Sequence, residues 1–159
     1  MSGSLTGILI VPLLIGIVAG LRAMTAPAAV SWAARLGWIN TAPTGFAFLG
    51  WAYTPWILTL LALGELVTDQ LPTTPSRTVP VQFAARLVTG GLSGAAVGAA
   101  NGNFVAGLGS GVAGAVIGTL GGRQFRGALA KAFGNDHPAA FIEDAVAIGG
   151  AVLALAVFL

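Results

Sequence analysis

The chain has 159 residues, of which 56% are hydrophobic and only 8% are charged, and its mean hydropathy is +0.90. Soluble proteins carry roughly 25% charged residues, so this composition excludes a soluble globular domain, a disordered chain and a collagen-like repeat. The net charge of +2 rests on seven basic and five acidic residues. Basic residues this sparse indicate membrane topology and predict no nucleic-acid partner. We expect one all-α, polytopic membrane domain over residues 1–159 and, with no cysteine and a single histidine, no cofactor.

About five glycine-rich transmembrane helices are expected, since a span needs about 20 mostly apolar residues. Residues 5–21 are uncharged and predict a retained first span, because no basic residue precedes the run as in a signal peptide. A short helix over 25–37 follows, with Thr25 as its cap and Gly37 as its stop. It is too short to cross a bilayer, so we expect it to be interfacial or re-entrant. The second span covers about 46–68.

The uncharged run over 87–122 would be about 54 Å long as a single helix, far more than a hydrocarbon core of about 30 Å. The Asn-Gly-Asn sequence at 101–103 predicts a turn that divides this run. The third span must then begin before the run, which places Arg86 inside the helix, either snorkelling or paired. The last three expected spans are about 79–100, 104–121 and 138–158.

Five spans would place the termini on opposite sides of the membrane. With a cytoplasmic N-terminus, the inner side holds five basic residues: Arg77, Arg86, Arg123, Arg126 and Lys131. The outer side holds two, Arg22 and Arg35, with no acidic residue near them. The positive-inside rule therefore favours a cytoplasmic N-terminus in the bacterial cytoplasmic (inner) membrane.

Glycines recur at every fourth residue along the expected third and fourth spans. The rows are Gly90, Gly94, Gly98 and Gly102; Gly107 and Gly111; and Gly114, Gly118 and Gly122. Small residues at this spacing allow close helix packing, as in a glycine zipper, or smooth faces along a pathway. The chain after Arg22 and after Arg123 is loosely similar, with a short basic segment and then another span, which suggests a possible inverted repeat.

Two sets of polar residues are candidate binding sites. Glu65 and Asp69 share a helix face, and with Glu143 and Asp144 they form a candidate cation- or proton-binding group. The alternative is that these acids only neutralise the basic residues in structural ion pairs.

The second set pairs an arginine with a threonine at an expected helix start: Arg22 with Thr25, and Arg77 with Thr78. Each pair is a candidate anion or lipid-headgroup site. The alternative is ordinary anchoring at the membrane interface. Whether any metal binds cannot be read from these residues.

Four strings carry a family resemblance: GLRAMTAP (20–27), AARLG (33–37), GELVTDQLPTTPSRT (64–78) and EDAVAIGG (143–150). Over nearly its whole length the chain resembles an uncharacterised bacterial family of small integral membrane proteins, domain of unknown function 4126. The resemblance implies a helical membrane fold and nothing catalytic. It directs attention to Arg22, Glu65, Asp69, Arg77, Glu143 and Asp144.

These features favour a small transporter or channel for an ion or an anionic or lipid-phosphate solute. Five short helices hardly enclose a pathway alone, so we expect a homo-oligomer, a dimer, in contact with membrane lipids. One alternative is a non-transporting membrane assembly or lipid-organising protein. Another is a membrane enzyme acting on lipid phosphates, although no residues form a specific catalytic motif.

Overall fold

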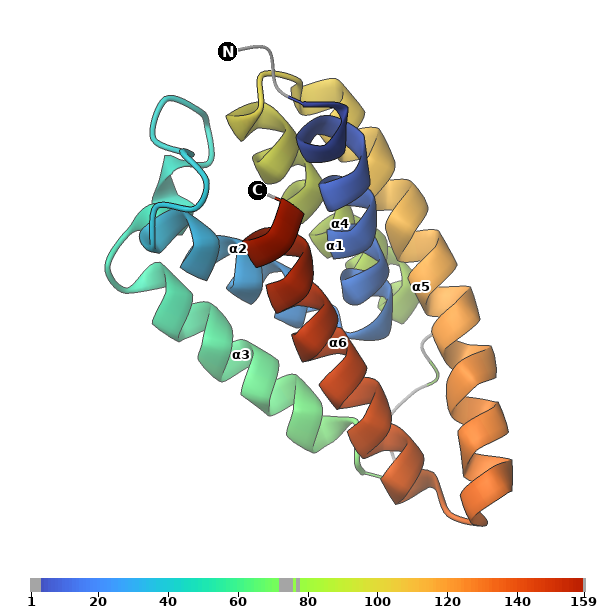
Figure 1. Ribbon diagram of the computed structural model, residues 1–159. Coiled ribbons are helices and arrows are strands. Elements are labelled where there is room, and N and C mark those ends of the chain that lie inside the picture. Colours follow the sequence, from blue (N-terminus) through green and yellow to red (C-terminus); the bar gives the residue numbers. More distant parts are fainter. Residues whose placement is uncertain (1–3, 72–75, 77, 159) are drawn as a thin grey trace.

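The computed structural model describes residues 4–71, 76 and 78–158, and within them all regular structure is helical (Figure 1). The expected all-α class is therefore confirmed for this part of the chain. The elements are η1 (Thr6–Ile10, a π-helix), α1 (Val11–Leu21), α2 (Thr25–Arg35), η2 (Ala47–Gly50, a 3-10 helix), α3 (Thr54–Thr68), α4 (Pro80–Ala100), α5 (Phe104–Phe133) and α6 (Asp136–Phe158).

Among the described residues, three helices are long and apolar enough to cross a membrane, namely α4, α5 and α6 as far as Ala156. The expectation of about five such helices is wrong in number. The first expected span is a shorter apolar helix, Thr6–Leu21, and the second is reduced to α3, with 15 residues. α3 is short because the backbone is extended at Trp51, after η2. The helix restarts only where Pro55 occupies its first turn, a position that does not need an N–H donor.

The turn at 101–103 and α4 agree with the sequence, and Gly102 adopts a φ of 87° in the turn. α5 does not end near residue 121 but continues to Phe133, because nothing interrupts it before Gly134, whose φ of 67° stops the helix. No short separate helix therefore follows Arg123. The element that the inverted repeat requires, a counterpart of α2, is missing there.

The chain runs back and forth between two ends of the bundle (Figure 1). We call the end with turn 101–103 the turn end, and the end where α5 meets α6 the hairpin end. α1 leads away from the turn end, α2 leads part of the way back, and α3 leads away again. After α4, α5 and α6, the start of η1 and the end of α6 lie at the same end. The chain therefore does not follow the expected simple series of five crossings, because α2 makes an additional return inside the bundle.

α1, α4 and α5 pack with their backbones in direct contact. A Cβ atom on Gly94 would lie 2.5 Å from the carbonyl oxygen of Gly107, and one on Gly114 would lie 2.1 Å from that of Leu13. Only glycine allows these helix axes to approach so closely. The three helices thereby form a rigid unit against which the others pack.

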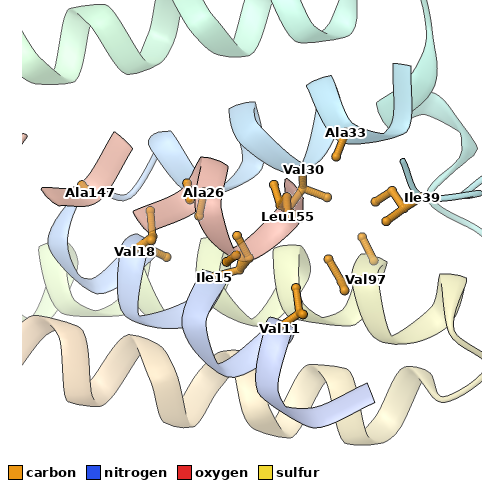
Figure 2. Close-up of a cluster of buried hydrophobic side chains, with 14 of the residues drawn as sticks. Val11, Ile15, Val18, Ala26, Val30, Ala33, Ile39, Val97, Ala147 and Leu155 are labelled. Atoms are coloured by element: carbon orange, nitrogen blue, oxygen red, sulfur yellow. The ribbon is translucent and has the colours of Figure 1, made fainter. Parts of the chain in front are cut away.

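The apolar core lies on the other side of α1, between α1, α2, α4 and α6 (Figure 2). Val11, Ile15, Val30 and Val97 are 0% exposed, and Leu155 is 2% exposed. Val30 belongs to α2, so the expected short helix exists and is buried along one face. Between helices that associate in lipid, such side chains stabilise the fold through close van der Waals packing.

α3 packs on the outer side of α2, and a hydrogen bond and an aromatic contact join the two helices. Trp32 of α2 donates from Nε1 to the Thr59 hydroxyl at 2.9 Å. Its ring also meets Trp56 edge to face, with the centroids 5.0 Å apart. Most of the remaining surface of α3 is exposed and apolar. The contact with α2 therefore positions α3, and with it Glu65 and Asp69 at the end of α3.

Candidate functional site

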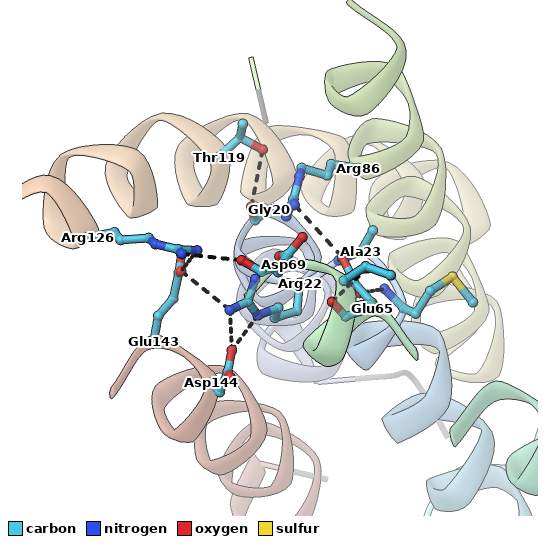
Figure 3. Close-up of polar contacts among 12 residues, drawn as sticks. Gly20, Arg22, Ala23, Glu65, Asp69, Arg86, Thr119, Arg126, Glu143 and Asp144 are labelled. Carbon is cyan, nitrogen blue, oxygen red and sulfur yellow. Dashed lines mark hydrogen bonds and ion pairs between the residues drawn. The ribbon is translucent and has the colours of Figure 1, made fainter. Parts of the chain in front are cut away.

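Arg22 stands at the centre of a buried network of charged side chains at the end of α1 (Figure 3). Its side chain is 0% exposed. Its guanidinium donates to Asp69, which follows α3, and to Asp144 of α6. The Nη2 atom lies 3.7 Å from Oε2 of Glu143, also on α6. An arginine suits this position because its planar fork of donors stays charged and can serve several carboxylates at once.

Glu65 of α3 forms a second part of the network. Its two carboxylate oxygens accept hydrogen bonds from the backbone N–H groups of Ala23 and Met24, each at 2.8 Å. These amides directly precede α2, where the first N–H groups of a helix have no partner within it. A carboxylate also suits the positive end of the helix dipole. The expectation that Thr25 caps α2 is wrong, since the helix begins at that residue with no side-chain cap.

Arg86 joins α4 to this network and is 3% exposed. Its Nη1 donates to the carbonyl oxygen of Gly20 at 2.8 Å, and its Nη2 lies 3.8 Å from Glu65. The Gly20 carbonyl belongs to the last turn of α1, where helical carbonyls lack intrahelical partners. The Thr119 hydroxyl of α5 also lies 3.5 Å from it. The prediction that Arg86 lies inside its helix is confirmed, and of the two alternatives, snorkelling and pairing, the structure shows pairing.

Arg126 of α5 connects the buried part of the network to the surface at the hairpin end. It pairs with Asp136 through Nε at 2.9 Å and Nη2 at 2.5 Å, and its Nη1 lies 3.5 Å from Oε2 of Glu143. The side chain of Asp136 is 58% exposed, that of Arg126 is 17% exposed and that of Glu143 is 0% exposed. Sequence reasoning missed Arg126 as a site residue because it ended the fourth span at residue 121. The available signal was the absence of proline between residue 104 and Gly134.

Carboxylates outnumber guanidinium groups in this network. All five acidic residues of the chain take part, against three arginines among the described residues. The acids are Glu65, Asp69, Asp136, Glu143 and Asp144, and the arginines are Arg22, Arg86 and Arg126. Asp136 is exposed to solvent, so the buried part of the network holds four carboxylates against these three arginines. Buried ionised groups are expensive in a region of low dielectric unless they are paired, so protonation of any of these four carboxylates would alter the balance of charge.

The carboxylates are directed at arginines and backbone amides rather than at one another. Among the described residues, no group of three or more acidic or histidine side chains is arranged to hold a metal ion. Each buried carboxylate is therefore held by an arginine or by backbone amides.

The structure brings together all four members of the expected cation or proton group, Glu65, Asp69, Glu143 and Asp144. It adds Arg22, which sequence reasoning had placed on the opposite side with no acidic residue near it, and that expectation is wrong.

The two arginine–threonine pairs lie in different surroundings. Thr25 is 7% exposed at the start of α2. Thr78 lies near Arg123 of α5, whose Nη1 is 3.4 Å from the threonine hydroxyl. Arg77 is outside the described residues. Arg22 and Thr25 are thus enclosed by the chain. Of the two pairs, only the second has a described member, Thr78, that lies near an exposed basic residue, Arg123.

A pocket of about 460 Å³ lies apart from the network, between the end of α2 and η2. It is lined by Ala34, Gly37, Ile39, Asn40, Thr41, Ala42, Ala47, Gly50 and Trp51. None of these side chains is ionisable in the physiological range. The groups able to move a proton or hold an ion are therefore concentrated in the network.

The network lies entirely within the part of the chain that matches a family model. Residues 9–158 match the family described as Domain of unknown function (DUF4126). The chain belongs to this family. The resemblance noted in the sequence is confirmed, and every arginine and acid described above falls within the DUF4126 region. No curated protein and no solved structure matches the chain.

Proposed function

We propose that this DUF4126 protein is an integral membrane protein that conducts or transports a proton or cation by way of the buried charge network. Three apolar helices support the membrane location. At 1.5 Å per residue, Arg86 lies about 21 Å along α4 from Ala100, and Glu143 lies about 20 Å along α6 from Ala156. Both lie inside a hydrocarbon core of about 30 Å, closer to the hairpin end.

The burial of Glu143 between two arginines is the observation that carries this proposal. Glu143 is fully buried between Arg22, directly after α1, and Arg126 of α5. Ionisable groups at such depth are costly and mark ion and proton pathways. A proton on Glu143 weakens both contacts together. Protonation is thereby coupled to the packing of α6 against α1 and α5, which is the coupling that a transporter needs.

The geometry favours a proton or cation over an anionic or lipid-phosphate solute. Arg22, the deepest basic group, is surrounded by three carboxylates of its own chain. The start of α2, which could attract an anion, holds the carboxylate of Glu65. An external anion would have to displace these internal ones.

We also propose that the hairpin end faces the cytoplasm of a bacterial cell. Toward this end lie Arg22, Arg86, Arg123, Arg126 and Lys131, whereas Arg35 follows the course of α2 toward the turn end. The positive-inside rule then assigns the hairpin end to the inner side. This orientation places the start of η1 outside, opposite to the orientation that five spans implied.

A homodimer remains part of the proposal. The backbones of α1, α4 and α5 are in direct contact, which leaves little room for a pathway within one copy. A second copy would supply the remaining wall, and two-fold dimers are the commonest assemblies of identical chains.

The test is a proton-flux assay on liposomes that contain the purified protein and a trapped pH-sensitive dye, with a potassium gradient and valinomycin to set the voltage. We expect flux well above that of empty liposomes, and at least a tenfold loss in Glu143→Gln. Arg35→Gln, which removes an exposed charge outside the network, serves as the matched control. The proposal fails if wild-type liposomes match empty ones, or if Glu143→Gln conducts as wild type does.

A second candidate function, a non-transporting membrane assembly protein, is favoured by one observation. The direct backbone contacts of α1, α4 and α5 would also suit a protein whose role is to pack tightly in the bilayer. This function predicts that Glu143→Gln lowers the stability or the oligomeric state, while neither variant nor wild type conducts protons.

A further inference from the structure

The acidic residues near the hairpin end are paired with arginines, whereas two basic residues of α5 have no acidic partner in the described part of the chain. All five acidic residues lie in the network, where each one contacts an arginine. Arg123 and Lys131 of α5 are instead exposed, and neither contacts a carboxylate in the described part of the chain. The ionisable side chains of α5 at this end are therefore all basic, and the one exposed acidic residue there, Asp136 at the start of α6, is paired with Arg126.

The length of α5 places this surface at the level of the lipid headgroups. A hydrocarbon core of about 30 Å accommodates about 20 helical residues. Counted from Phe104, the helix leaves that core near Arg123. On the membrane placement proposed above, the last turns of α5 begin in the headgroup layer near Arg123 and extend about 15 Å beyond the core to Phe133.

These last turns are amphipathic. At 100° per residue, Arg123 and Lys131 lie about 80° apart around the helix and form one face. Phe125 and Phe133 form the opposite face and are 42% and 55% exposed. Arg126 lies between the two faces and turns toward Asp136. Exposed basic residues just beyond the end of an apolar span are attracted to anionic lipid headgroups.

We propose that Arg123 and Lys131 form a binding surface for anionic phospholipid headgroups on the cytoplasmic leaflet. The lipid phosphates would contact the two basic side chains. Arg123 already directs Nη1 toward the Thr78 hydroxyl at 3.4 Å, and that hydroxyl lies 3.0 Å from the Ser76 hydroxyl. These two hydroxyl groups provide further donors for a phosphate oxygen.

The test is native mass spectrometry of the full chain in detergent micelles doped with equal amounts of phosphatidylglycerol and phosphatidylcholine. We expect the wild type to retain phosphatidylglycerol preferentially. Arg123→Gln combined with Lys131→Gln should weaken retention about fivefold per residue, or roughly 25-fold in total. Arg35→Gln, which removes one exposed positive charge elsewhere, is the control and should retain the lipid as wild type does. All three proteins should unfold at the same temperature, because the substituted side chains are exposed.

Three results would overturn this inference: no preference in the wild type, undiminished retention in the double variant, or an equal loss in Arg35→Gln. A dimer that is lost in the double variant without any lipid dependence would assign the surface to a second copy instead. The outcome is separate from the proposed function, because proton flux through Glu143 does not require Arg123 or Lys131.

Discussion

Replacing Arg22 with methionine tests whether the charge network holds the helices together. The substitution keeps an unbranched side chain of comparable length but removes the guanidinium that contacts Asp69, Glu143 and Asp144. These carboxylates would then lose their central partner while they remain largely shielded from water. Breaking a buried ion pair from one side costs about 3–5 kcal/mol. Three acids share this arginine, so we expect a loss in the upper part of that range.

The assay is thermal and denaturant unfolding in detergent micelles, followed by the fluorescence of the four tryptophans. At about 2–4 °C per kcal/mol for a chain of this size, the midpoint should fall by roughly 10–20 °C. Adding Asp144→Asn to Arg22→Met should recover part of the loss, with a coupling energy of about 1–3 kcal/mol. Arg35→Gln is exposed and should change stability by less than about 0.5 kcal/mol. A loss below about 1 kcal/mol in Arg22→Met would show that the network does not stabilise the fold.

Two further pairs of substitutions probe the packing of α5 against α1 and the cap at the start of α2. Gly114→Ala should destabilise the protein by about 1–3 kcal/mol in the same unfolding assay, because its Cβ would lie 2.1 Å from a backbone oxygen of α1. Gly121→Ala, where nothing lies within 4 Å, should be neutral or slightly stabilising, and equal losses at both glycines would contradict the packing argument. Glu65→Ala should speed amide hydrogen exchange in the first turn of α2 and cost about 1–2 kcal/mol, because the two backbone amides before that helix lose their acceptor. Glu65→Gln keeps one acceptor oxygen, so its exchange rate and stability should lie between those of the wild type and those of Glu65→Ala. Unchanged exchange in Glu65→Ala would argue against the cap.

Local sequence patterns predicted the individual helices well where a residue acts on its immediate neighbours. Gly37 and Gly102 adopt positive φ values of 81° and 87° at the predicted helix stop and turn. Such positions can be predicted because only glycine enters that conformation without strain. The pattern failed at residue 121, where an uncharged run ended but the helix did not. Arg123 and Arg126 are good helix formers, so a change in polarity was mistaken for a change in structure.

Composition and periodicity by themselves determined that this is a helical, apolar, glycine-rich chain with a few ionisable groups worth testing. Those properties depend on residues close together in the sequence. Only the tertiary structure decided that Arg22 meets Asp69 and Asp144, which are 47 and 122 residues away, and that Glu65 caps a helix starting 40 residues earlier. These contacts depend on the direction in which α2 leaves α1 and on how α3 and α6 are rotated about their own axes. An apolar helix in lipid carries little sequence information about its rotation, because most of its faces are equally hydrophobic.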